Sequence, residues 1–399
     1  MERSGIMFEI AINELGSEVD KTAYVMLPAN KNAVIDAMDR DKVFGETFVR
    51  IERCDKFPEL NGFEFSEEPT LDELNFLAKR LEEISGDTSE KYAYRALLRK
   101  PMDTIGEAIN RTYNLQTIPV YPCKNVYAYG EIVLENEMLE ELDDIPDEVY
   151  EWLDPDKVGR AMADREGGVF IDAYYVVTSG YEPALVYDEE LPEPQEDWIF
   201  KLEVAAVPEK PEDISKVKAE ILTLHIDEKY MRKIAEQLGE KYIGDCNIMK
   251  FESAIPQIND SAIESAEDVF LLNEIAEKYS DLSREDAAKF KAVLQNEAWK
   301  SLDEAENILK NLDGYDFDIS VTDASDFGRK YLSEMLPLDF DRSLLEGVNA
   351  AELAQNVLHI NGGSITAYGA VSGYGGHLYS MIEAPQQEQE SSFEMGGIS

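Results

Sequence analysis

Short hydrophobic runs at the start of the chain predict an α+β fold. Apolar residues dominate two segments, 7–12 (MFEIAI) and 23–27 (AYVML), and a third strand-like run covers 47–52. Between them, Asn30 can cap a helix over 30–38. Four residues of this helix are expected to face the core: Ala33, Val34, Ala37 and Met38.

A helical region is expected after these strands. Thr70 and Glu73 form a capping-box pattern, and five apolar residues follow at helical spacing: Leu74, Leu77, Ala78, Leu81 and Ile84. The pattern predicts further helices over 90–99 and 103–114, and a strand over 169–177.

The stretch from Tyr129 to Tyr181 is repeated, in diverged form, from Phe327 to Tyr374. The matched landmarks are Tyr129-Gly130 with Phe327-Gly328, Leu153-Asp154 with Val348-Asn349, Gly167-Gly168 with Gly362-Gly363, and a final Ser-Gly-Tyr. A strand over 219–224, a helix opened by 265–268, and helices over 286–294 and 302–312 repeat earlier elements at a similar offset. This order predicts a tandem duplication, with a first copy over 1–180 and a second, more diverged copy over 198–380. Residues 181–197, with three prolines and seven acids, are expected to link the copies, and 381–399 to form a disordered tail.

The first copy contains the most acidic stretch of the chain. Twelve Asp or Glu residues lie between Glu131 and Asp156, and no Lys or Arg lies between Lys124 and Lys157. If 131–145 is one helix, Leu134, Met138, Leu142 and Ile145 share one face, and Glu137, Glu140, Glu141 and Asp144 share another. Like charges at this spacing destabilise a helix by roughly 0.2 to 0.5 kcal/mol per pair. Such a row indicates either a solvated face or a surface that binds something positive.

We take the carboxylates of this stretch, and those of the second copy between Asp316 and Glu346, as candidate partner-binding residues. In the first copy they are Glu131, Glu135, Glu137, Glu140, Glu141, Asp143, Asp144, Asp147, Glu148, Glu151, Asp154 and Asp156. In the second copy they are Asp316, Asp318, Asp323, Asp326, Glu334, Asp339, Asp341 and Glu346.

Composition supports a folded but strongly negative protein. The chain has 399 residues with 44% hydrophobic content, and its 83 acidic and 37 basic residues give a net charge of −46. Such a field repels nucleic acid and anionic membranes and attracts basic partners. Three cysteines without a CxxC pattern indicate reduced thiols in a cytoplasmic protein, and no apolar run is long enough to span a membrane. No nucleotide loop, metal-ligand spacing or hydrolytic triad is present, so we expect no cofactor, no metal and no enzymatic activity.

The landmarks of the first copy resemble the ArdA family of antirestriction proteins. The resemblance rests on the aromatic-Gly pair, the acidic run, Ile145-Pro146, Leu153-Asp154 and Gly159-Arg160, and on Tyr24-Val25-Met26-Leu27-Pro28 near the start. It covers residues 7–180 well; the second copy departs at Ala354, where Gly159 is expected, and at Leu224-His225, where Leu-Pro is expected. The resemblance implies a row of three small subdomains per copy (α+β, helical, α+β) and a DNA mimic that inhibits type I restriction-modification enzymes. It also implies a dimer, made either by two copies in one chain or by two chains.

Two other classes of function remain open. One is inhibition of a different DNA-binding defence complex, such as a CRISPR effector; the other is an acidic scaffold that binds a basic nucleoid protein. A carboxylate-metal nuclease is the third class, but evenly spread acidity without a basic patch argues against DNA as its substrate.

Overall fold

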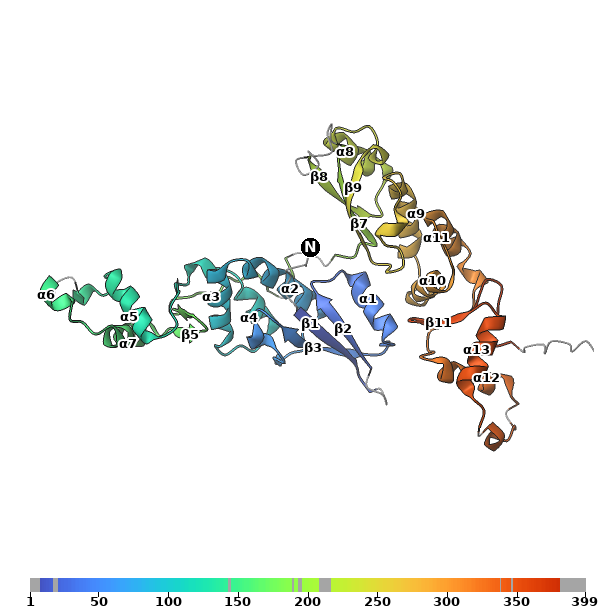
Figure 1. The fold of residues 1–399 in the computed structure, drawn as a ribbon, viewed down its shortest axis with the longest axis horizontal. Helices are drawn as coiled ribbons and strands as arrows, with labels where there is room; N and C mark the ends of the chain where they lie inside the picture. Colours follow the sequence, from blue (N-terminus) through green and yellow to red (C-terminus); the bar gives the residue numbers. More distant parts are fainter. Residues whose placement is uncertain are drawn as a thin grey trace, which may run out of the picture. The chain divides into compact units, whose positions relative to one another are not determined.

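A computed structural model describes residues 8–16, 21–142, 145–188, 190–192, 196–207, 217–337, 339–345 and 347–380, except the side chains of Leu142, Asp147 and Glu148. The chain divides into a first unit, Met1–Trp198, and a second unit, Ile199–Ser399. In Figure 1 the first is blue to green and the second yellow-green to red.

The first unit is a mixed α+β structure. Its strands are β1 (Phe8–Glu14), β2 (Thr22–Leu27), β3 (Thr47–Cys54), β4 (Val120–Tyr121), β5 (Val169–Ile171) and β6 (Tyr174–Val176). Its helices are α1 (Lys31–Arg40), α2 (Leu71–Ser85), α3 (Thr88–Leu98), α4 (Ile105–Asn110), α5 (Val126–Glu135), α6 (Asp147–Tyr150) and α7 (Pro155–Glu166).

The three predicted N-terminal strands form one antiparallel sheet in the order β2-β1-β3. Central β1 pairs Phe8 with Leu27 on one side and with Cys54 on the other. Asn30 caps α1, as expected, because its side chain accepts a hydrogen bond from the Asn32 N–H. Ala33 was expected to face the core, but it is exposed, and the buried positions of α1 include Asp36 and Asp39 instead.

Helices α2 to α4 lie between this sheet and the α5–α7 end of the unit (Figure 1). The Thr70–Glu73 capping box is confirmed, and all five predicted apolar residues of α2 are buried. The helix expected over 103–114 is shorter, spanning Ile105–Asn110, because Thr104 caps its start and the left-handed Asn114 (φ 58°) turns the chain soon after its end.

The strand expected over 169–177 is a hairpin. β5 and β6 pair antiparallel through a turn at Asp172, whose φ is 52°, and β4 completes a sheet in the order β4-β6-β5. Arg95 of α3 holds this turn, with its guanidinium 2.5 Å from Asp172 and 3.0 Å from Glu59. The hairpin is therefore tied to the helical region by a partly buried ion-pair network.

The second unit has the same order of sheets. Its strands are β7 (Phe200–Ala205), β8 (Ala219–Leu224), β9 (Asn247–Ser253), β10 (Phe317–Asp318), β11 (Ser364–Thr366) and β12 (Gly369–Val371). Its helices are α8 (Glu228–Leu238), α9 (Asp268–Ser280), α10 (Arg284–Asn296), α11 (Leu302–Lys310), α12 (Ala324–Met335) and α13 (Ala350–Ile360). The sheets run β8-β7-β9 and β10-β12-β11, so the central strand corresponds to that of the first unit in each case.

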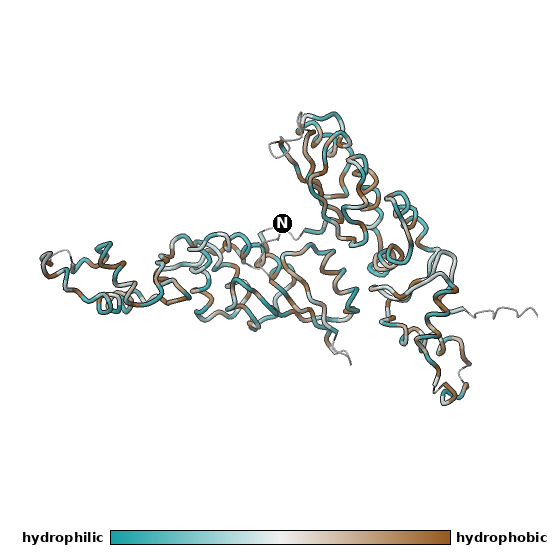
Figure 2. The backbone as a smooth tube through the Cα atoms, in the orientation of Figure 1, coloured by the Kyte–Doolittle hydropathy of each residue, from teal (hydrophilic) through white to brown (hydrophobic). Residues whose placement is uncertain are grey.

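The predicted strand at 219–224 and the helices near 286–294 and 302–312 are confirmed as β8, α10 and α11. The residues at 265–268 also open a helix, with Asp268 accepting hydrogen bonds from the N–H groups of Glu264 and Ser265. Each unit has one large hydrophobic core under its first sheet and helices, and a smaller one at its C-terminal helix pair. Hydrophilic positions recur along the whole length of both units (Figure 2).

Part of the segment predicted to be a linker packs on the first unit. The Asn110 amide accepts hydrogen bonds from the N–H groups of Val186 and Tyr187, and Tyr181, Tyr187 and Leu191 contact the core. The proposed tail, 381–399, lies outside the described residues. Within the described ranges, no helix has the length and apolar character needed to cross a bilayer.

Candidate partner-binding surface

Most of the predicted acidic residues lie on two pairs of helices or on the segments that connect them. We call α5 and α7, with the segment between them, the first helical lobe, and α12 and α13, with their connection, the second helical lobe. In the first lobe α5 and α7 pack closely, because a Cβ at Gly130 would lie 1.8 Å from the Pro155 carbonyl oxygen. In the second lobe a Cβ at Gly328 would lie 1.9 Å from the Ala350 carbonyl oxygen. The aromatic-Gly pairs thus permit the same backbone contact in both lobes.

The other matched landmarks also have equivalent places. Asp154 caps α7 and Asn349 caps α13, each accepting a backbone N–H two or three residues later. Gly168 and Gly363 each precede a hairpin and approach its second strand, β6 or β12, where a Cβ would lie 2.7 Å from the Val176 oxygen and 2.2 Å from the Val371 oxygen, respectively.

The single helix expected over 131–145 is wrong. α5 ends at Glu135, and Glu137 takes a left-handed conformation (φ 51°). The Met138 N–H then bonds the Val133 oxygen and the Glu137 N–H bonds the Leu134 oxygen, which is the arrangement of a Schellman cap. Met138 and Leu139 turn back into the small core of this lobe. Consequently Glu137, Glu140 and Glu141 do not share a helix face.

The first lobe nevertheless presents many carboxylates to solvent. Glu131 and Glu135 lie on α5, Glu137 and Glu140 follow it, and Glu151 and Asp154 precede α7; all six are exposed. Within the described part of the chain, none of these six takes part in a recorded ion pair. Glu131 and Glu135 repel each other because they carry like charges at i,i+4 on α5. Glu135 also lies at the negative end of the helix dipole, and α5 has no basic residue in its last turn to compensate.

Two carboxylates of the first lobe are neutralised by arginines. Arg160 lies 2.8 Å from Asp156, and its hydrogen bond lowers the pKa of that carboxyl. Arg165 lies 2.5 Å from Glu141 and lowers the pKa of Glu141 in the same way. The i,i+4 spacing of Asp156 and Arg160 could have indicated the first pair from the sequence.

Several predicted acids in and just before the second helical lobe contact groups of their own chain. Asp318 is half-buried; burial raises its pKa, but hydrogen bonds from Ser320 and Tyr379 lower it overall. Asp316 pairs with His377, and Asp326 lies 3.8 Å from Arg329. Asp323 caps α12, and Asp341 accepts two hydrogen bonds from Ser343. Glu334 and Asp339 are exposed.

Five of the predicted residues cannot be placed in this surface. Asp143, Asp144 and Glu346 lie outside the described residues, as do the side chains of Asp147 and Glu148.

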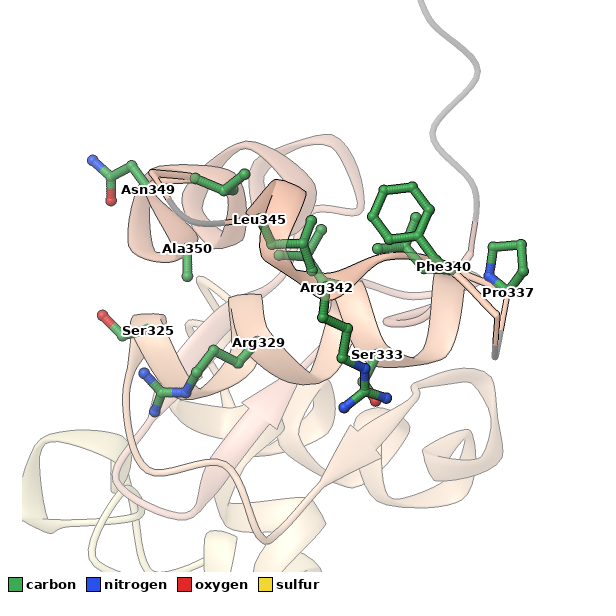
Figure 3. Close-up of a pocket in the computed structure, with 12 residues that line it drawn as sticks. Ser325, Arg329, Ser333, Pro337, Phe340, Arg342, Leu345, Asn349 and Ala350 are labelled. Carbon is green, nitrogen blue, oxygen red and sulfur yellow. The ribbon is translucent and has the colours of Figure 1, made fainter.

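The second lobe has a cavity lined by arginines. A cavity of about 600 Å³ between α12 and α13 is lined by Arg329 and Arg342 together with Leu332, Leu336 and Phe340. The two guanidinium groups extend toward the same side in Figure 3. Arg329 is one residue after Gly328, where the first lobe has Glu131 after Gly130. The two lobes therefore share a scaffold but differ in surface charge.

The sequence prediction missed an aromatic residue of the first lobe. Trp152 is 86% exposed and lies between Glu151 and Asp154, with exposed Val149 nearby in the chain. Because tryptophan is enriched among the residues that dominate protein interfaces, we add Trp152 to the candidate partner-binding residues. The sequence could have indicated this residue, because Trp152 directly precedes the Leu153-Asp154 landmark in the acidic stretch.

The remaining candidate chemistry is limited. Cys54, Cys123 and Cys246 are buried thiols, and burial raises the pKa of Cys54 to about 12 and of Cys246 to about 11. Among the residues that the structure describes, no group of three or more His, Cys, Asp or Glu is placed to hold a metal ion. No protein-family model matches this chain, and a comparison with curated proteins finds no significant match.

Proposed function

We propose that this chain is an acidic, non-enzymatic protein of the cytoplasm that imitates DNA and occupies the DNA-binding groove of a type I restriction-modification enzyme. Carboxylates of the first helical lobe take the places of phosphates in that groove. The chain would be a tandem duplication of an ArdA-like unit, with the second copy diverged in charge.

The carboxylates of the first lobe are the observation that carries this proposal. Six exposed acids there form no ion pair with any residue that the structure describes, and two of them, Glu131 and Glu135, lie where they destabilise their own helix. A surface that served only solubility would gain from nearby lysines in the same helix. Acids kept at a cost to local stability are expected where a partner supplies the positive charge.

The charge of the whole chain supports the same class of partner. A net charge of −46 repels DNA and attracts proteins whose grooves are lined with Lys and Arg. Such grooves obtain much of their affinity from phosphate neutralisation, which an array of fixed carboxylates can reproduce.

The test is inhibition of a purified type I enzyme by the purified full-length protein, measured on unmodified plasmid DNA. We expect inhibition that competes with DNA, and an inhibition constant that weakens steeply as salt rises from about 50 to about 200 mM. Anisotropy of a labelled DNA duplex bound to the enzyme would report displacement directly.

Two results would overturn the proposal. One is full restriction activity at a large molar excess of the protein. The other is inhibition without displacement of DNA, which would indicate a different mechanism. Binding to a histone-like nucleoid protein without any effect on the enzyme would favour the scaffold alternative.

A further inference from the structure

The first unit contains a groove that its own chain fills. The backbone of residues 196–198 lies across the start of α1, where the Lys31 N–H donates to the Glu196 oxygen at 3.0 Å. Asn30 and Asn32 donate from their side-chain amides to the oxygens of Trp198 and Asp197, at 2.5 and 2.8 Å. On α2, Lys79 lies 3.6 Å from the Glu196 carboxylate. Residues 196–198, which we call the strap, are thus bound by hydrogen bonds at the start of α1 and by an ion pair to α2.

The second unit has the same groove between α8 and α9. Asn75 of α2 accepts the Ala29 N–H at 2.7 Å, and Asn273 of α9 accepts the Ile226 N–H at 2.9 Å, which fixes the correspondence of the two sites. Asn30 caps α1, and Asp227 caps α8. Counting from these anchors, Lys31 corresponds to Glu228, and Lys79 corresponds to Glu277.

Two lysines beside the strap, Lys31 and Lys79, are therefore replaced by glutamates at the corresponding positions of the second unit. Four carboxylates line this site, Asp227, Glu228, Glu274 and Glu277, with Lys278 as the single lysine. That lysine pairs with Glu306 on α11 and with Glu274. The net character of the site is negative.

No described segment of the chain fills the second site as 196–198 fills the first. It is a cavity of about 1050 Å³. The residues that would correspond to 196–198 lie outside the described part of the chain. Shortly after the matched Ser-Gly-Tyr, Leu378 is buried in the second unit's small C-terminal core and the Tyr379 ring stacks on Phe327. Tyr230 and Phe270, which line the site, are 46% and 43% exposed. Exposed aromatic rings beside carboxylates suit a guanidinium group, which can stack and form ion pairs together.

We propose that this acidic groove, formed by α8 and α9, binds an extended arginine-containing segment of a partner protein. The segment would lie as residues 196–198 lie in the first unit, with its charges reversed to match Glu228 and Glu277. This inference rests on the comparison of the two grooves and does not depend on the proposed inhibition of a restriction enzyme.

The test uses the full chain and two labelled peptides. The first, Gln-Arg-Arg-Trp-Ile-Phe, is the sequence of residues 195–200 with arginines in place of its two acids; the second is the unchanged sequence Gln-Glu-Asp-Trp-Ile-Phe. Fluorescence anisotropy at about 150 mM salt would measure binding, because screening at that ionic strength suppresses long-range attraction to the net charge.

We expect the arginine peptide to bind the unmodified protein and the acidic peptide to bind weakly or not at all. The charge reversal E228K/E277K should raise the Kd of the arginine peptide about tenfold or more. The same variant should gain affinity for the acidic peptide. The matched control is E236K/E264K, which changes the net charge equally at exposed residues outside the groove. This control should alter the Kd by less than about twofold.

Equal weakening by both double variants would overturn the proposal, because it would mean that only bulk charge attracts the peptide. Absence of binding by the unmodified protein would overturn it too. If E228K/E277K loses its folded circular dichroism signal, E228Q/E277Q provides the same comparison without introducing positive charge. An arginine-peptide Kd unchanged in that variant would contradict the assignment.

Discussion

Gly130 of α5 lies against Pro155, the first residue of α7, so closely that a Cβ on the glycine would be 1.8 Å from the Pro155 carbonyl oxygen. Gly328 has the same relationship to Ala350 in the second unit, at 1.9 Å. Backbone atoms cannot move aside as a flexible side chain can, so each contact requires a residue without a Cβ.

Replacing Gly130 by alanine should therefore separate the two helices of the first lobe. We expect a loss of about 2 kcal/mol or more in the free energy of unfolding of this lobe. Native-state hydrogen exchange of the α5 and α7 amides at increasing urea would measure it. The control is Gly86→Ala, because a Cβ at Gly86 meets its nearest atom at an ordinary 3.7 Å and the residue has helical backbone angles. Equal stability of both variants would show that the helices can move apart without cost.

Neutralising the unpaired acids of the first lobe should separate binding from stability. In the variant E131Q/E135Q/E137Q/E140Q, inhibition of the target enzyme and its salt slope should both decrease. The lobe should be as stable as before or more so by a few tenths of a kcal/mol, since the repulsion between Glu131 and Glu135 is relieved. The control neutralises four acids elsewhere, Asp188, Glu189, Glu190 and Glu193. If both variants lose inhibition equally, total charge matters and position does not.

Trp152 should contribute to binding without contributing to folding. It is 86% exposed, so Trp152→Ala removes few native contacts and should leave the melting temperature nearly unchanged. If the side chain is buried by the partner, the same change should weaken inhibition by about tenfold or more. Quenching of Trp152 by acrylamide should also fall when the partner is added. Unchanged quenching in the complex would exclude this residue from the interface.

Glu306 should make the second unit sensitive to acid. Its carboxylate accepts hydrogen bonds from Lys278 of α9 and from Lys310 of α11, the latter at 2.7 Å. Burial raises the pKa of Glu306, but these hydrogen bonds lower it overall to about 2. A lowered pKa means that the stabilisation is complete above the unfolded value near 4.5 and is lost as the pH falls toward about 2.

The free energy of unfolding, measured at each unit of pH between pH 6 and pH 2, would test this. We expect Glu306→Gln to lower the free energy of unfolding at neutral pH by an amount on the order of 2 kcal/mol and to flatten its decrease below about pH 4.5. The exposed Glu285→Gln should keep the pH dependence of the unmodified protein. A variant at Glu306 with an unaltered acid slope would contradict the assigned pKa.

The sequence by itself determined the elements whose signals are local. The capping box at Thr70, the helix cap at Asn30, and the buried stripe of α2 follow from residues within one or two helical turns of each other. The mixed α+β class follows from the same short-range patterns. Because these interactions involve neighbours in the chain, they hold whatever the rest of the fold does.

The tertiary structure alone decided where the acidic stretch stops being helical and which acids are neutralised. The continuous pattern over 131–145 fits a helix, but the chain ends α5 at Glu135 because Met138 and Leu139 are needed in the small core against α7. Glu141 meets Arg165 across 24 residues of sequence, a distance at which no spacing rule applies. The contact of residues 196–198 with the start of α1 likewise joins segments more than 160 residues apart in the sequence. Contacts between distant segments are set by packing of the whole unit, so periodicity along the chain could not predict them.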